Sequence, residues 1–148
     1  MKSLKEVFSE TIGLHSKIGR VLELSDYGEY GDLSGLEADE GDSGQIFLLG
    51  ELQVIMKHLD EVNGRLKYLS RPVKEVSRLH RNSAGRYETD GGHYYTSGNS
   101  IEALVQDGSR EVPYWARTSV EHNGRDYYLV GYDGIKLDGL TVRVRGEA

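Results

Sequence analysis

Side chains able to carry out chemistry are scattered along this chain. The five histidines have neither a second histidine nor a carboxylate at a spacing typical of metal ligands: His15, His58, His80, His93 and His122. No serine stands in a G-x-S-x-G turn, no glycine-rich phosphate-binding loop is present, and the lack of cysteine excludes thiol chemistry. We therefore expect a protein that is not an enzyme, with no catalytic residues, no cofactor and no metal site.

Carboxylates, by contrast, are concentrated in one glycine-rich segment. Residues 26–42 contain no Lys or Arg and carry −7, while the whole chain carries −6, so the remainder is nearly neutral. The seven acids are Asp26, Glu29, Asp32, Glu37, Asp39, Glu40 and Asp42. An EF-hand calcium loop starting at Asp39 would have Gly41 at a ligand position and Gly50 in place of the closing glutamate. The segment therefore does not fit this kind of calcium site.

Two interpretations of this acidic loop, residues 26–44, stay open. The first is a solvated, flexible linker, because so polar a segment buries too little surface to offset its ordering entropy. The second is a binding surface that offers carboxylates to a basic protein or mimics nucleic-acid phosphates. General attraction of the chain to nucleic acid is not expected, because its net charge is negative.

Tyrosine is the other residue type that could mark a site. Eight of the ten tyrosines follow residue 67, and adjacent pairs such as Tyr94-Tyr95 must point to opposite faces of a sheet. Some of these rings must then lie on the surface, where aromatic and arginine side chains together are typical of an interaction patch. The expected aromatic and basic face comprises Tyr94, Trp115, Arg117, Tyr128, Arg143 and Arg145. The alternative is that Trp115 and most tyrosines fill the core.

Two amphipathic segments precede the tyrosine-rich half. Residues 4–24 have apolar side chains at three- and four-residue spacing, which predicts one helix with one buried face. A second, coiled-coil-like seam alternates by four and three without a break: Leu48, Leu52, Ile55, Leu59, Val62, Leu66 and Leu69. We expect one helix to about residue 70, then a kink or a short new helix at Pro72. The alternative is a break at Gly64 and a three-helix bundle.

The chain is expected to combine these helices with a small β domain in an α+β fold. The two helices most simply form an antiparallel hairpin over residues 1–80, whose surplus apolar positions cover the next domain or a second copy of the chain. Turn signals at Asp90-Gly91-Gly92 and Asn123-Gly124 predict five or six short antiparallel strands over residues 81–148. Their number and spacing favour a small meandering barrel or rolled sheet, SH3-like, with residues 135–140 as a turn before the last strand.

Several stretches of this half match a known pattern in order and spacing. They are Leu79 to Tyr87, Thr96 to Gly98, Ile101-Glu102, Trp115 with Thr118, Glu121 to Gly124, Tyr127 to Gly131, and Leu137 to Arg145. On these residues, positions 79–146 resemble a small uncharacterised domain of bacterial and mobile-element proteins. The resemblance implies no catalytic residues. It implies a context of plasmids, phages and conjugative elements and of the systems that act against them.

A cytoplasmic location is expected, because the chain has no cysteine, no apolar run like a signal peptide and no stretch of about 18 apolar residues. The expected function is that of a non-catalytic protein-binding module of a phage or mobile-element protein. The most specific version of this expected function is an anti-CRISPR-like inhibitor of a host defence complex. The expected partner is a basic or nucleic-acid-binding protein.

Two other functions stay open at this point. One is a nucleic-acid-binding SH3-like module that uses the β-domain aromatics and arginines. It is not favoured, because residues 81–148 contain eight basic and ten acidic side chains. The other is a structural self-assembly protein in which the helical seam forms a homodimer.

Overall fold

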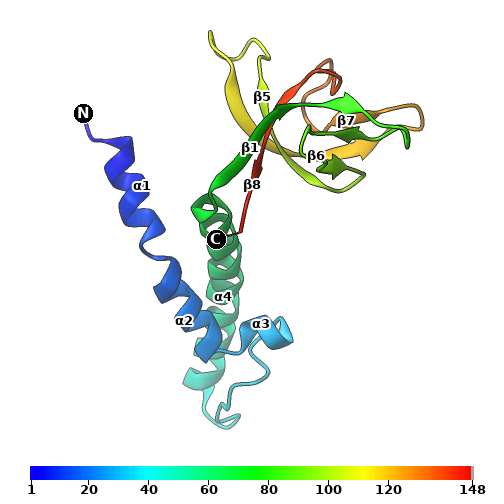
Figure 1. Cartoon of the computed structure of the whole chain (residues 1–148). Helices are drawn as coiled ribbons and strands as arrows, with labels where there is room; N and C mark the ends of the chain where they lie inside the picture. The colour runs from blue at the N-terminus through cyan, green and yellow to red at the C-terminus, as the bar shows by residue number, and fades with distance from the viewer. Residues whose placement is uncertain (148) are drawn as a thin grey trace. The chain divides into compact units, whose positions relative to one another are not determined.

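The computed structural model describes residues 1–147 and divides them into two compact units, Met1–Arg71 and Pro72–Glu147 (Figure 1). The first unit is helical and the second consists of antiparallel strands, which confirms the α+β class. No helix of the described part is long and apolar enough to cross a membrane.

The first helical segment is divided in two. Helix α1 (Leu4–Ile12) ends at Gly13, and α2 (His15–Leu24) begins two residues later, so the single helix expected over residues 4–24 is wrong. The Thr11 hydroxyl donates a 2.6 Å hydrogen bond to the Val7 carbonyl, and the Leu14 amide bonds Thr11 three residues back. Such side-chain and three-residue bonds tighten and bend a helix at this point.

Helix α4 (Ser43–Ser70) is continuous through Gly64, as expected. It begins at Asp42, whose carboxylate accepts hydrogen bonds from the Gly44 and Gln45 amides at 2.9 and 3.3 Å. It ends just before Pro72, because a proline disfavours helical geometry in the preceding residue. The kink or new helix expected beyond Pro72 is wrong, since that stretch is a β-strand.

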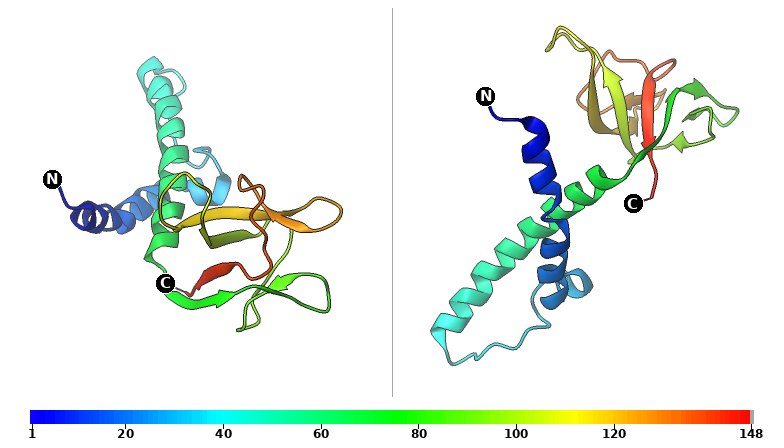
Figure 2. Two further views of the ribbon diagram at one scale, coloured as in Figure 1. Left: turned by 90° about the horizontal axis from the view of Figure 1, so that it is seen from above. Right: turned by 60° about the vertical axis from the view of Figure 1, so that its left-hand side comes forward.

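The core of the helical unit lies where α2 crosses α4, and the two views of Figure 2 show this crossing. Its buried residues are Leu22, Leu33 and Met56. Leu52 and Leu59 of the predicted seam pack against them, so one side of that seam is used inside the unit. Between α2 and α4 lie the short helix α3 (Tyr27–Tyr30) and the rest of the acidic loop.

The second unit contains two antiparallel sheets. A five-stranded sheet has the order β1-β8-β5-β6-β7, and a three-stranded sheet has the order β2-β3-β4. The strands are β1 (Val73–Arg78), β2 (His80–Arg81), β3 (Tyr87–Glu88), β4 (Tyr94–Tyr95), β5 (Ser100–Val105), β6 (Tyr114–His122), β7 (Tyr127–Leu129) and β8 (Thr141–Arg145). The predicted turns at residues 90–92 and 123–124 join β3 to β4 and β6 to β7, and residues 135–140 are a turn before β8.

Of the two forms expected for this unit, a barrel or a rolled sheet, the barrel is wrong. Closure needs backbone pairing between the first and last strands of the sheet, but β1 and β7 are its two edges. The turn between β3 and β4 contacts β1 through side chains instead. The Asp90 amide donates to Ser77 Oγ, and the Gly91 amide donates to the Glu75 carboxylate, each at 2.9 Å.

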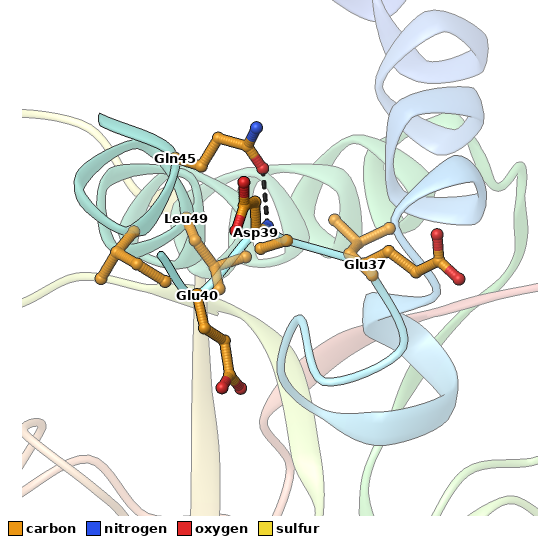
Figure 3. A pocket seen from close by; sticks show the side chains of 8 residues that line it. Glu37, Asp39, Glu40, Gln45 and Leu49 are labelled. Atoms are coloured by element: carbon orange, nitrogen blue, oxygen red, sulfur yellow. Dashed lines mark hydrogen bonds between the residues drawn. The ribbon is translucent and has the colours of Figure 1, made fainter. Parts of the chain in front are cut away.

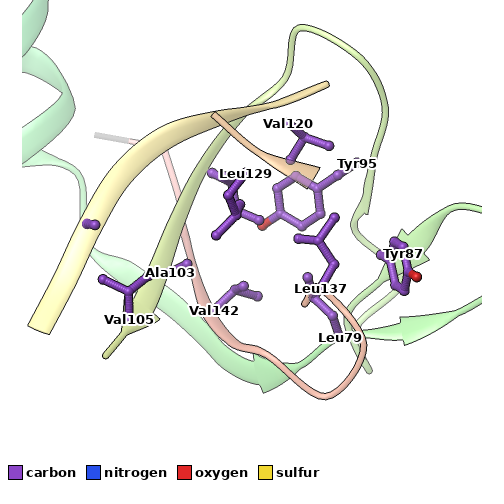
Figure 4. Packing of buried hydrophobic residues seen from close by; sticks show 11 residues of the cluster. Leu79, Tyr87, Tyr95, Ala103, Val105, Val120, Leu129, Leu137 and Val142 are labelled. Atoms are coloured by element: carbon purple, nitrogen blue, oxygen red, sulfur yellow. The ribbon is translucent and has the colours of Figure 1, made fainter. Parts of the chain in front are cut away.

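Apolar side chains from both sheets form one core (Figure 4). The Tyr95 ring lies among Val120, Leu129 and Leu137, while its neighbour Tyr94 is exposed. This confirms that adjacent tyrosines point to opposite faces. The core holds the strands of the five-stranded sheet in register and so places the polar residues of its other face.

Candidate functional site

The acidic loop and the first turns of α4 enclose an open groove. Two adjoining pockets of about 670 and 410 Å³ share Ile46 and Leu49 as lining residues. Around the first pocket lie the side chains of Glu37, Asp39 and Glu40 (Figure 3). Asp32 lines the second. We call this feature the acidic groove: apolar residues Leu36, Ile46 and Leu49, with the carboxylates of residues 32–40 around them.

The loop that forms the groove is attached to α4 by specific contacts. Leu33 is buried in the helical core at 3% exposure, and its amide donates a 2.9 Å hydrogen bond to Gln53 Oε1. The Asp39 amide donates a 2.8 Å bond to Gln45 Oε1, drawn as a dashed line in Figure 3. The expectation of a mainly flexible linker therefore does not describe residues 33–39. Their backbone is held by two glutamines of one helix.

All seven acids of the loop are exposed, and within residues 1–147 none of them forms an ion pair. Three of them also shape the loop. Asp32 accepts from the Ser34 amide, Asp39 from the Gly41 amide, and Asp42 caps α4. Hydrogen bonds from the Ser34 side chain and amide hold the pKa of Asp32 below its ordinary value. The groove is thus a region of uncompensated negative charge at neutral pH.

The predicted aromatic and basic face is brought together in large part by the five-stranded sheet. Strand β5 lies between β6 and β8, and Glu102 of β5 pairs with Arg117 on one side and Arg143 on the other. Trp115 lies two residues before Arg117 on β6, and Arg145 lies two residues after Arg143 on β8, both on the same face. The expectation that four of these residues share a face is therefore confirmed for Trp115, Arg117, Arg143 and Arg145.

Buried Glu102 is the centre of this face. Its side chain is only 5% exposed and accepts hydrogen bonds from Arg143 Nε and from Arg145 Nε, the latter at 3.0 Å. The Arg143 guanidinium also lies 4.4 Å from the centre of the Trp115 ring, within cation–π range. The face therefore carries one carboxylate among three guanidiniums and one indole.

The two remaining residues of the predicted face lie outside the arginine cluster formed by Arg117, Arg143 and Arg145. Tyr128 of β7 pairs with Glu121, which is on the same face of β6 as Trp115 but near the other end of that strand. Tyr94 belongs to the three-stranded sheet, where Arg86 lies 5.7 Å from its ring centre. Tyr94 is thus not part of the arginine cluster, because its strand pairs with β3 and not with β6 or β8.

Sequence reasoning missed Glu102 as a site residue. The signal was present, since one acid interrupts the apolar strand Ile101 to Val105. Sequence reasoning also did not predict which side chains of the helical seam stay exposed to solvent. Leu48, Ile55, Val62 and Leu69 are all exposed on α4, and α1 buries none of its residues. Within residues 1–147 no three His, Asp or Glu side chains are grouped to hold a metal ion.

Residues 77–144 match a family model described as Domain of unknown function (DUF5348). No curated protein and no solved structure was found to match the chain. The matched range covers β2 to β7, the last two residues of β1 and most of β8. It therefore contains Glu102, Trp115, Arg117 and Arg143, but neither Arg145 nor the acidic groove. The match confirms that the C-terminal half of the chain is similar to an uncharacterised domain.

Proposed function

We propose that the chain is a non-catalytic protein-binding module that takes up a basic, amphipathic segment of a partner protein in the acidic groove. One observation carries the proposal. The same groove combines exposed Ile46 and half-buried Leu36 and Leu49 with carboxylates that have no ion-pair partner among residues 1–147. Apolar contact supplies affinity, while unpaired surface charge selects partners of opposite sign and speeds their encounter.

The attachment of the loop supports this function. Binding costs less free energy when the receiving surface is already ordered, because fewer side chains and backbone bonds lose freedom. Buried Leu33 and the Gln45 and Gln53 contacts hold the loop against α4 before any partner arrives. The partner segment should be rich in Lys or Arg with Leu-like side chains on one side. A helix with one basic and one apolar face has this composition.

Fluorescence anisotropy with a labelled amphipathic Lys/Leu peptide tests the proposal. We expect saturable binding that weakens as salt increases, and much weaker binding of the same peptide with Glu in place of Lys. The double substitution Glu37→Gln and Glu40→Gln should weaken binding about tenfold, at roughly 0.5–1 kcal/mol for each lost charge. Equal affinity for the two peptides would refute the groove as a basic-segment site.

A matched control keeps the loss of charge but moves it away from the groove. Glu10→Gln with Glu61→Gln removes two exposed carboxylates from α1 and the second half of α4. This pair should leave peptide affinity within about twofold of the unmodified protein. If both pairs weaken binding equally, the peptide responds to net charge and not to the groove.

A narrower role is that of a phage or mobile-element inhibitor that acts on a basic, nucleic-acid-binding component of a host defence complex. It is supported by the context that the family resemblance implies, and by the acidic groove, which offers carboxylates where such a component carries phosphate-binding Lys and Arg. Pull-down from lysate of a host with such a system, with the Glu37/Glu40 variant as control, tests it. Capture of the complex by both proteins alike would refute it.

The face of the five-stranded sheet around Glu102 favours a second candidate function, nucleic-acid binding by an SH3-like module. Three arginines and Trp115 share this face, which could contact phosphates and stack on a base. Anisotropy with single- and double-stranded oligonucleotides at low salt tests this candidate. Arg117→Gln is the informative variant, because Arg117 is exposed and its Nε donates a 3.4 Å hydrogen bond to Ser100 Oγ, a neutral group. No binding at low salt removes this function.

A further inference from the structure

An apolar stripe remains exposed along α4 on a different side from the acidic groove. It consists of Leu48, Ile55, Val62 and Leu69, with exposures of 54%, 46%, 43% and 42%. These residues repeat every seven positions, so they lie one above another along about 30 Å of helix. We call them the α4 stripe. On one flank the helix carries Leu52, Leu59 and Leu66, which are half-buried or buried.

Helix α1 shows the same lack of cover. It has nine residues, its apolar side chains Leu4, Val7 and Phe8 are exposed, and none of its residues is buried. A helix shorter than about 12–15 residues is marginal in water unless an apolar face packs against something. The helical unit therefore packs α2 in its core but leaves apolar side chains of α1 and the α4 stripe exposed.

We propose that the α4 stripe is the interface of an antiparallel homodimer, in which two copies of α4 lie face to face across a two-fold axis. A seven-residue repeat over three heptads is the length at which helices pair along such a seam. With the axis between His58 and Leu59, Leu48 lies opposite Leu69 of the second copy, and Ile55 lies opposite Val62. All four layers are then filled by apolar pairs.

The flanks of the stripe decide the orientation. In an antiparallel pair, each flank of one helix meets the same flank of the other, whereas a parallel pair brings opposite flanks together. One flank is the Leu52 and Leu59 side, which packs in the core with α2. In the antiparallel pair the open flank therefore meets the open flank of the second copy, whereas a parallel pair would place it against the flank that packs with α2.

Charges on the open flank agree with this orientation. Glu51 and Arg65 both lie on it, fourteen residues apart, and both are exposed. Within residues 1–147 neither forms an ion pair. In the antiparallel dimer, Glu51 comes within one residue of the level of Arg65 of the second copy, and the symmetry makes this contact twice. The chain is thus complementary to itself along this flank.

This interface goes beyond the proposed function and does not depend on it. Ile46 and Leu49 of the groove do not lie in line with the stripe. Ile46 is about half a turn, and Leu49 about a third of a turn, around the helix from Leu48 and Ile55. None of the four residues of the stripe lines the groove. Substitutions in one surface should therefore not change binding at the other.

Sedimentation equilibrium of the full chain over a range of concentrations gives the first test. We expect the mass of two chains, and the double substitution Ile55→Glu with Val62→Glu should weaken the dimer about a hundredfold or more, because it buries unpaired charge. Val76→Glu, at an exposed valine of β1, is the matched control and should leave the dimer intact. A monomer at about 100 µM, or a dimer insensitive to the stripe variant, overturns the proposal.

Charge reversal tests the orientation. Glu51→Arg alone should weaken the dimer about tenfold, because two attractive contacts become repulsive, and the added reversal Arg65→Glu should restore it. A parallel dimer would show neither effect. Circular dichroism of each variant checks that the monomer stays helical, since all substituted side chains are exposed.

Cross-linking gives an independent readout, because the chain contains no cysteine. Mixed chains carrying Ile55→Cys and Val62→Cys should form a disulfide-linked heterodimer on mild oxidation, whereas Ile55→Cys alone should not cross-link with itself. Self-linking of each single variant would show in-register parallel helices and refute the antiparallel interface. If the stripe variants lower dimerisation but not peptide binding, the two surfaces are separate, as proposed.

Discussion

Glu102 of β5 is paired directly with Arg143 of β8, and its buried carboxylate accepts a hydrogen bond from the Nε of that arginine. Arg145 bonds the same carboxylate from two residues further along β8. The two guanidiniums would repel each other without this acid between them. The ion cluster therefore ties β5 to β8 by side chains as well as by backbone bonds.

Removal of this carboxylate should destabilise the β unit. We predict that Glu102→Ala lowers the free energy of unfolding by about 2–4 kcal/mol, because two partly buried guanidiniums lose their acceptor. Urea unfolding followed by the emission of Trp115, the single tryptophan, measures this. Glu111→Ala, which removes an exposed acid of the same unit, is the control. A loss no larger than that of the control would show that the cluster contributes no stability.

The stability of the β unit should depend on the ionisation of Glu75. Its carboxylate accepts hydrogen bonds from the Thr89 hydroxyl at 3.0 Å and the Gly91 amide at 2.9 Å. Burial acts to raise the pKa of Glu75, but the bonds from Gly91, Thr89 and Ser77 and the nearby charge of His93 outweigh it and lower the pKa below its ordinary value of 4.5. The folded state therefore prefers the ionised form.

The sign of the pH effect follows from this lowered pKa. The stabilisation is complete above the unfolded-state pKa near 4.5 and is lost as the pH falls through the lower folded-state value. We predict that the stability difference between the unmodified protein and Glu75→Gln is largest above about pH 5 and narrows on further acidification. Urea unfolding at a series of pH values measures it, with Glu111→Gln as control. A difference that does not change with pH would contradict the prediction.

The order of the acidic loop should depend on Leu33. Leu33→Ala removes a side chain buried with Leu22 and Met56 and should lower the free energy of unfolding of the helical unit by about 2–4 kcal/mol. Amide hydrogen exchange at residues 33 and 39 should become faster, because their bonds to Gln53 and Gln45 depend on the docked loop. Leu24→Ala, at an exposed leucine, is the control and should leave both unchanged.

The features that depend on neighbouring residues could be predicted from the sequence. The turns at residues 90–92 and 123–124, the continuity of α4 and the opposite orientation of Tyr94 and Tyr95 are confirmed. Each rests on glycine turns, on an unbroken helical period or on the two-residue alternation of a strand. The division of the first helix was not predicted, because apolar spacing does not register the local bond from Thr11 to Val7.

Contacts between distant residues were decided only by the tertiary structure. The sequence indicated that Trp115, Arg117, Arg143 and Arg145 share a face if their strands are neighbours. The structure brings them together differently, because β6 and β8 lie on the two sides of β5 and its Glu102 lies between them. Likewise, periodicity by itself determined that α4 has an apolar seam from Leu48 to Leu69. Only packing decided that α2 covers the Leu52 and Leu59 side and leaves Ile55 and Val62 exposed. A repeat in the chain sets which side chains lie in line, whereas the partner that covers them depends on the path of the rest of the backbone.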